Sequence, residues 1–258
     1  EVTVRLHPIP EQAVALRISF DDVDSACTTA AALVAAGAAV TRVELVDAWI
    51  VSAINAYSGT SYPEGPCLFV EAAGSEHVVA GDLELVQGLA LEEGATEIVH
   101  ERDAASRARL WQARHDTTHA AAAKMPGTKE RATDTCVPLT ELAGAVRFAR
   151  AEIDRLGLDA GIVGHAGDGN VHVSIHLDPA DADALARSEE LVHRVVDDAL
   201  ARGGTCTGEH GIGLGKIDAL EREHGDLLPL MRGLKRAFDR GGILNPGKVV
   251  RPAAGLDG

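Results

Sequence analysis

The chain has 258 residues, few aromatic side chains (3%) and a formal net charge of −15 at pH 7. This length allows one large domain or two small ones that share a core. An acidic surface repels nucleic acid and anionic membranes, so no nucleic-acid partner is expected, and an anionic substrate would need a local basic pocket.

The cysteine spacing and the lengths of the apolar runs indicate in which cellular compartment the protein is expected. The four cysteines are far apart with no Cys-x-x-Cys, which excludes a zinc ribbon and argues against a disulfide framework. We expect no signal peptide, and no apolar run approaches the roughly 18 residues of a membrane span. A reducing cytoplasm is predicted, with peripheral attachment at a membrane left open. Because the chain starts at Glu1 and enters directly on a strand-like segment, Val2–Leu6, we expect a piece of a longer polypeptide.

The first half of the chain is predicted to alternate strands and helices. Strands are expected at 15–20, 41–46, 67–71 and 97–100. Helices are expected at 21–36, with Asp21 as N-cap, and at 78–93, and a short additional helix carries Trp49, Ile50 and Ile54 on one face. This order is βαββαβ with one extra helix, the ferredoxin-like arrangement.

The pattern is predicted to repeat after a helix at 104–124. The expected elements are a strand at 135–139, a helix at 141–156, a hairpin around Asp168-Gly169, a helix at 180–201 and a strand at 204–207. The fold class is therefore α+β, a duplicated ferredoxin-like sandwich with helices on one face of the sheet. Half one covers about 1–124, half two about 125–207, and a helical segment with stretches at 215–223 and 227–240 completes the chain to 258. The other sheet face is left for another domain or a ligand.

The stretch GHAGDGNVH, residues 164–172, predicts a metal-binding pair. A two-residue type I′ turn at Asp168-Gly169 would place His165 directly opposite His172. Directly opposed residues hold their Cβ atoms roughly 4.5–5.5 Å apart, so two imidazoles could share one ion. Alternating apolar residues from Val171 put His172 on the polar face of a half-buried strand. A hydrogen-bonded structural role for the two histidines is the alternative.

A glycine-rich loop surrounds Glu209-His210 and lets the backbone approach another group closely. Its spacing fails both the dinucleotide-binding and the Walker patterns, so we expect it to present a side chain. Glu209 could complete a set of two histidines and one carboxylate that leaves coordination positions open. His210 would point the other way in an extended backbone, which suits a general base. Two surface loop residues without a function are the alternative.

A basic group is expected near this site. Arg114 and Thr118 lie one turn apart on one face of the predicted helix, with Lys129 beyond a Pro-Gly loop. Arg114 could hold a carboxylate through two parallel hydrogen bonds. An ordinary solvated arginine is the alternative. The Gly- and Pro-rich tail around Asn245 forbids a continuing helix and is read as either a turn or a site.

Five segments carry a family pattern. They are WQARH at 111–115, TDTCVP at 133–138, GHAGDGNVH at 164–172, GGTCTGEHGIG at 203–213 and NPGK at 245–248. Together they span nearly the whole chain, and they resemble the C-terminal domain of FAD-linked oxidases of the D-lactate dehydrogenase (cytochrome) and glycolate oxidase group.

This resemblance implies a duplicated ferredoxin-like cap over the isoalloxazine ring of FAD, which a preceding domain binds. It implies oxidation of a small D-2-hydroxy acid to the 2-oxo acid with hydride transfer to FAD. The implied site consists of His165, His172 and Glu209 as ligands of a divalent metal, zinc or manganese, His210 as the base, Arg114, Thr118 and Lys129 as substrate-binding residues, and Asn245 near the flavin.

Two departures from the family refine this expectation. The FAD-binding domain is absent from these 258 residues, so the isolated chain should hold little or no FAD and be inactive. Relatives that act on D-2-hydroxyglutarate have a lysine two residues before the position of Asp134, where this chain has Ala132, and this favours D-lactate. The electron acceptor is unknown and a homodimer is left open. A flavin-independent metal-dependent hydrolase or lyase and a non-catalytic ferredoxin-like binding module are the alternatives.

Overall fold

The computed structural model describes residues 1–6 and 8–251. The strands are β1 (Gln12–Ser19), β2 (Val40–Val46), β3 (Cys67–Gly74), β4 (Glu97–Glu101), β5 (Lys129–Ala132), β6 (Thr135–Cys136), β7 (Asp159–His165) and β8 (Asn170–Leu177). The α-helices are α1 (Val23–Ala35), α2 (Ala48–Ser58), α3 (Glu76–Glu92), α4 (Ala104–His115), α5 (Thr117–Lys124), α6 (Leu142–Leu156), α7 (Ala182–Ala201), α8 (Ile217–His224) and α9 (Leu228–Phe238). Two 3₁₀ turns, Leu139–Glu141 and Gly225–Leu227, precede α6 and α9.

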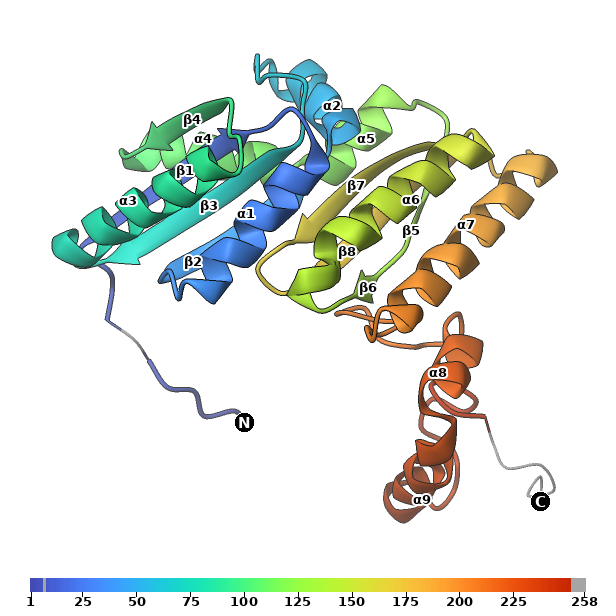
Figure 1. Ribbon diagram of the computed structural model, residues 1–258. Coiled ribbons are helices and arrows are strands. Elements are labelled where there is room, and N and C mark those ends of the chain that lie inside the picture. The colour runs from blue at the N-terminus through green and yellow to red at the C-terminus, as the bar shows by residue number, and fades with distance from the viewer. Residues whose placement is uncertain (7, 252–258) are drawn as a thin grey trace.

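One antiparallel sheet joins the two halves of the chain, and α8 and α9 lie beyond it (Figure 1). Its strand order is β4-β1-β3-β2-β7-β8-β5, and β6 also pairs with β8. The halves of the chain meet where β2 pairs with β7, through Glu44 opposite His165, Leu45 opposite Gly164 and Val46 opposite Val163. We call this junction the seam. The predicted α+β class, a mixture of helices with an antiparallel sheet, is confirmed.

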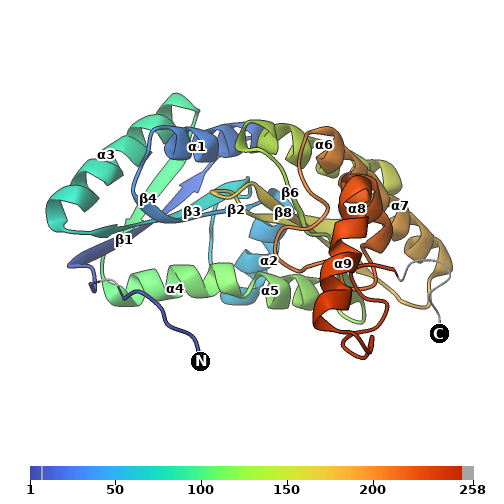
Figure 2. The ribbon, with the colours of Figure 1, turned by 90° about the horizontal axis from the view of Figure 1, so that it is seen from below.

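Helices cover both faces of the sheet, which corrects the expectation of a single covered face (Figure 2). Helices α1, α3, α6 and α7 pack on one face, over the larger apolar cluster, and α2, α4 and α5 pack on the other. Every residue of β8 is therefore buried. The prediction of a half-buried strand was wrong, because the face that carries His172 is covered as well. The alternation itself is present, because Val171, Val173 and Ile175 belong to the larger cluster while His172 faces the other side.

The first half follows the predicted order, with small shifts at the ends of elements. Helix α1 is capped by Asp22 rather than Asp21, because the Asp22 carboxylate accepts a hydrogen bond from the Ser25 N–H at 2.8 Å. The predicted strand over Val2–Leu6 is wrong, since those residues have no regular structure and are exposed. Among the described residues, no helix is both long and apolar enough to cross a membrane.

The second half departs further from prediction. The helix expected at 104–124 is interrupted at Asp116, and the strand expected at 204–207 is reduced to a single bridge between Cys136 and Thr205. Strand β5 was not predicted. It lies at the end of the sheet and reads Lys-Glu-Arg-Ala, a charged composition that is poor in β-formers but typical of edge strands.

The turn between β7 and β8 differs from the predicted one. Four residues, 166–169, form it, so His165 pairs with Asn170 and His172 pairs with Val163. The backbone N–H of Gly167 donates to the Val43 carbonyl at 3.2 Å, and the Val137 N–H donates to the Gly169 carbonyl at 3.0 Å. These contacts hold the longer turn against two neighbouring segments. The prediction of directly opposed histidines was wrong, and the two are diagonal neighbours on one face.

Gly169 is expected to be intolerant of a side chain. Its φ is +75°, and an added Cβ would lie 2.1 Å from the Val137 carbonyl oxygen. We expect Gly169→Ala to lower the free energy of unfolding by about 2–4 kcal/mol, combining left-handed backbone strain with overpacking. Gly37→Ala is the matched control, because Gly37 has φ +71° with nothing within 4 Å of an added Cβ. Equal losses in urea unfolding of both variants would contradict the close-approach argument.

Candidate metal and substrate site

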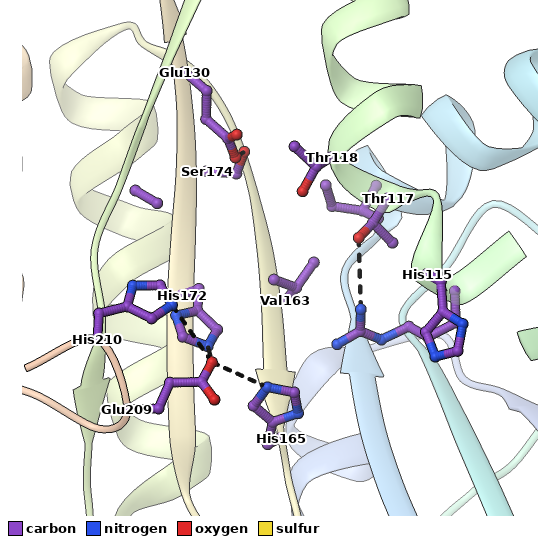
Figure 3. A pocket seen from close by; sticks show the side chains of 13 residues that line it. His115, Thr117, Thr118, Glu130, Val163, His165, His172, Ser174, Glu209 and His210 are labelled. Carbon is purple, nitrogen blue, oxygen red and sulfur yellow. Dashed lines mark hydrogen bonds and ion pairs between the residues drawn. The ribbon is translucent and has the colours of Figure 1, made fainter. Parts of the chain in front are cut away.

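Three potential metal ligands converge between the seam and the loop that follows α7 (Figure 3). Glu209 Oε1 lies 3.4 Å from His165 Nε2 and 3.3 Å from His172 Nε2. One donor atom from each of the three residues lies within 4.8 Å of the other two. The residues predicted as ligands therefore meet at one point even though the hairpin register differs.

The hydrogen-bond partners of the two histidines fix which ring nitrogen is free. His172 Nδ1 lies 3.1 Å from the Thr133 carbonyl oxygen, and His165 Nδ1 lies 2.8 Å from Glu44 Oε2. Because these oxygens only accept, each Nδ1 carries the proton and each Nε2 presents its lone pair toward Glu209. Burial also lowers the pKa of His172 and favours its neutral form. This is the arrangement that a metal-binding histidine requires.

Glu44 contacts two residues of the candidate site, and sequence reasoning missed it. Its burial tends to raise the pKa of the carboxyl, but the hydrogen bond with His165 and the Arg114 charge hold that pKa below its ordinary value. The same hydrogen bond raises the pKa of His165. Arg114 Nη2 lies 2.8 Å from Glu44 Oε2, so the predicted substrate-binding arginine is buried and already engaged with a protein carboxylate. No sequence pattern marks Glu44, because only the pairing across the seam brings it to His165.

Asp134 holds the glycine-rich loop against the sheet. Its carboxylate accepts hydrogen bonds from the backbone N–H groups of Glu209 at 3.1 Å and His210 at 3.0 Å, and from Asn170 Nδ2 at 3.0 Å. Lys216 Nζ lies 2.8 Å from Asp134 Oδ2 and 2.9 Å from the Asp134 carbonyl oxygen. Burial opposes ionisation of Asp134, but the hydrogen bonds from Lys216, Asn170 and the loop prevail and hold its pKa well below the ordinary value.

A second set of possible ligands, Asp134, His172 and His210, shares His172 with the first. The carboxylate of Asp134 is already occupied by several donors, and the His172 nitrogen nearest to it is Nδ1, which donates to Thr133. The Asp134 carboxylate and the Nδ1 atom of His172 are therefore already engaged in hydrogen bonds. The first set is therefore the one suited to a metal, and its two imidazoles and one carboxylate fit a divalent ion with open coordination positions.

His210 faces the same pocket as Glu209. The expectation that its side chain would point the opposite way was wrong, because the loop is not extended there. Its ring stacks on His172 with centroids 5.1 Å apart, and its Nε2 lies 3.5 Å from Glu209 Oε1. Its side chain is 55% exposed. His210 is therefore beside the candidate ligands and accessible to a substrate.

A pocket of about 330 Å³ adjoins the ligand group. Its lining includes Thr118, as predicted, and Ala132. The remaining lining residues are Ile50, Arg114, His115, Thr117, Glu130, Val163, His165, His172, Ser174, Glu209 and His210. Lys129 is exposed at the start of β5 and is not among them, and Asn245 lies in an exposed turn after α9, where it accepts a hydrogen bond from Lys248 Nζ at 3.1 Å. The structure therefore brings all the predicted residues except these two to one pocket.

Known proteins resemble the chain over almost its full length. It is 38% identical to the probable mitochondrial D-lactate dehydrogenase of Danio rerio, with 97% of this chain and 50% of the relative covered. It is 36% identical to the mitochondrial D-lactate dehydrogenase [cytochrome] of Arabidopsis thaliana, with 98% and 45% covered. It is 33% identical to the glycolate oxidase protein GlcD of Escherichia coli K12, with 97% and 50% covered. The chain thus spans about half the length of these relatives, and the mitochondrial names do not fit the predicted cytoplasmic location.

Solved structures share the fold at low sequence identity. A 4-ethylphenol oxidase from Gulosibacter chungangensis aligns with a TM-score of 0.69 at 15% identity, covering 95% of this chain and 55% of that one. A p-cresol methylhydroxylase aligns with a TM-score of 0.68 at 15% identity, covering 94% and 53%. The family model described as "FAD linked oxidases, C-terminal domain" matches residues 9–249. The chain therefore belongs to the family of C-terminal domains of FAD linked oxidases.

Proposed function

We propose that the chain is the substrate- and metal-binding part of a flavin-dependent dehydrogenase that oxidises a small D-2-hydroxy acid, with D-lactate favoured, to the 2-oxo acid. The main observation behind this proposal is that the Nε2 atoms of His165 and His172 meet the Glu209 carboxylate on the wall of a pocket. The D-lactate dehydrogenase and glycolate oxidase names of the relatives support the substrate class.

The residues of this chain have separable roles in that reaction. His165, His172 and Glu209 would hold the divalent metal, with Glu44 and Thr133 fixing the imidazole tautomers. A bound metal would acidify the 2-hydroxyl of the substrate, and FAD would accept the hydride from C2. His210 Nε2 would accept the hydroxyl proton, since its ring lies beside the ligands and lines the pocket.

The substrate carboxylate would bind on the side of the pocket formed by α4 and α5. Arg114 lines the pocket there, and its buried Nε has no hydrogen-bond partner among the described residues. Thr117 and Thr118 add hydroxyl groups to the same wall. Arg114 would therefore form an ion pair with Glu44 and also bind the substrate carboxylate.

The proposal can be tested on a longer protein that also contains the sequence before residue 1. We expect it to bind FAD, to be yellow and to reduce a dye with D-lactate. Failure to bind FAD after refolding with the cofactor would contradict it. Turnover by residues 1–258 alone, without flavin, would instead favour a metal-dependent hydrolase or lyase. Metal content that is unchanged in His172→Ala would favour a non-catalytic binding module.

Replacing Glu44 tests whether its hydrogen bond to His165 helps that histidine to bind a metal. Glu44→Gln should weaken divalent-metal binding by about 10–100-fold, as is typical when the partner of a metal-bound histidine is altered. Chelator competition on the purified protein measures this change. Glu97→Gln, a carboxylate paired with Arg17 near the other end of the sheet, is the control. Equal metal affinity in both variants would count against a role for Glu44.

We also propose that the two halves are two ferredoxin-like units joined at the seam. The strand order of the first half is β4-β1-β3-β2. In the second half, Thr205 bridges to β6, β6 pairs with β8, and β8 pairs with β7. The second order mirrors the first across the seam, which supports an origin by duplication.

A further inference from the structure

The candidate ligands occupy one end of the pocket, and a carboxylate occupies the other (Figure 3). Residues 172, 174 and 176 of β8 share the pocket face, and β5 places Ala132 opposite Ser174 and Glu130 opposite His176. Ser174 lies two positions after His172 on the strand, which corresponds to about 6.8 Å. A 2-hydroxy acid anchored near His172 would therefore direct the end of its carbon chain toward Glu130 and Ser174.

The Glu130 carboxylate contacts a neutral side chain and makes no ion pair with a lysine or arginine among the described residues. Glu130 Oε1 accepts a hydrogen bond from Ser174 Oγ at 2.5 Å, and the same hydroxyl lies 3.0 Å from His176 Nε2. His176 is buried against Trp49, with ring centroids 5.8 Å apart, and this burial lowers its pKa and favours the neutral ring. The neighbouring Arg131 pairs with Glu189 instead. This end of the pocket thus carries a carboxylate that, within the described ranges, no lysine or arginine neutralises.

The two ends of the pocket therefore differ in whether a cationic side chain lines them. Arg114 and His115 line the wall assigned to the substrate carboxylate, while Glu130 lines the end assigned to the carbon tail. A second carboxylate on the substrate would be brought toward a like charge, and unfavourable contacts of this kind are a usual source of specificity. An uncharged tail meets no such repulsion.

We propose, resting on the function proposed above, that Glu130 is a specificity-determining residue that excludes D-2-hydroxy acids with a second carboxylate. The substrates are then D-2-hydroxy monocarboxylates. Ser174 orients the Glu130 carboxylate, and His176 in turn borders Ser174.

FAD-loaded protein that includes the upstream sequence is assayed with D-lactate and with D-2-hydroxyglutarate. The measured quantity is kcat/KM for the dicarboxylate divided by kcat/KM for D-lactate. We expect Glu130→Gln to raise this ratio by about tenfold, a moderate effect because Glu130 is exposed and partly screened by water. Glu130→Lys should raise the ratio further by replacing repulsion with attraction. Folding should tolerate both changes, because the position is exposed on an edge strand.

Glu84→Gln is the matched control, since it removes one negative charge from an exposed position on α3, on the opposite face of the sheet. A ratio that changes by less than about twofold in both Glu130 variants would overturn the inference while leaving the proposed function intact. A wild-type protein that uses both acids equally well would do the same. Absence of D-lactate oxidation by the wild-type protein would overturn the proposed function and this inference together.

Discussion

His172→Ala should weaken divalent-metal binding by roughly 100-fold or more and abolish oxidation of D-lactate by protein that includes the upstream sequence. His172 contributes the more deeply buried of the two imidazoles, and its Nε2 is the lone pair closest to Glu209. Its replacement leaves His165 and Glu209 as an incomplete set. Elemental analysis of the purified variant measures the loss independently of activity.

His176→Ala is the control for that experiment. His176 lies on the same face of β8, is equally buried, and packs on Trp49 rather than on the ligand group. We expect this variant to keep its metal. If both variants retain the metal, the ion binds elsewhere. If both lose it, disruption of β8 rather than loss of a ligand explains the result.

Asp134→Ala should lower the free energy of unfolding by about 3 kcal/mol, because it leaves the Lys216 ammonium and several loop N–H groups without their partner. Metal affinity should fall as well, since Glu209 and His210 would no longer be held beside His172. Urea unfolding and chelator competition measure the two effects separately. The experiment tests whether Asp134 holds the loop in place, since Asp134 is not one of the proposed metal ligands.

Asp168→Ala is the matched control, an exposed carboxylate in the turn between β7 and β8. Its stability should change by at most about 0.5 kcal/mol, and its metal affinity should be retained. Adding Lys216→Met to the Asp134 variant should restore part of the lost stability by removing the unpaired charge. No restoration, or a normal metal affinity in Asp134→Ala, would contradict the role assigned to this carboxylate.

The sequence predicted which candidate ligands converge better than it predicted the geometry that joins them. Local patterns identified His165, His172 and Glu209, but the turn type was wrong because the four-residue turn is held by Val43 and Val137 from other segments. A turn set by distant backbone contacts cannot be read from its own residues. The three side chains still converge, since diagonal neighbours share a face of the sheet as directly opposed residues do.

Residues that act through other residues were the least predictable. Glu44 lies 121 positions before His165, and Lys216 lies 82 positions after Asp134, so only tertiary pairing joins them. Strand β5 was missed because its charged residues have weak strand propensity, and it is this strand that carries Glu130. The alternation along β8 was read correctly, but coverage of its second face by α2 and α5 is not encoded in β8 itself.

Because His165 belongs to one half of the chain and Glu44 to the other, the geometry of the candidate site depends on the pairing of the two halves. The larger apolar cluster also contains residues of both halves, so the cluster and the bond between Glu44 and His165 depend on the same junction. Residues 125–258 contain all three candidate ligands but lack Glu44, so this piece expressed alone should bind a divalent metal at least about 10–100-fold more weakly. Mixing it with residues 1–124 should restore the affinity only if strands β2 and β7 re-associate in the native register.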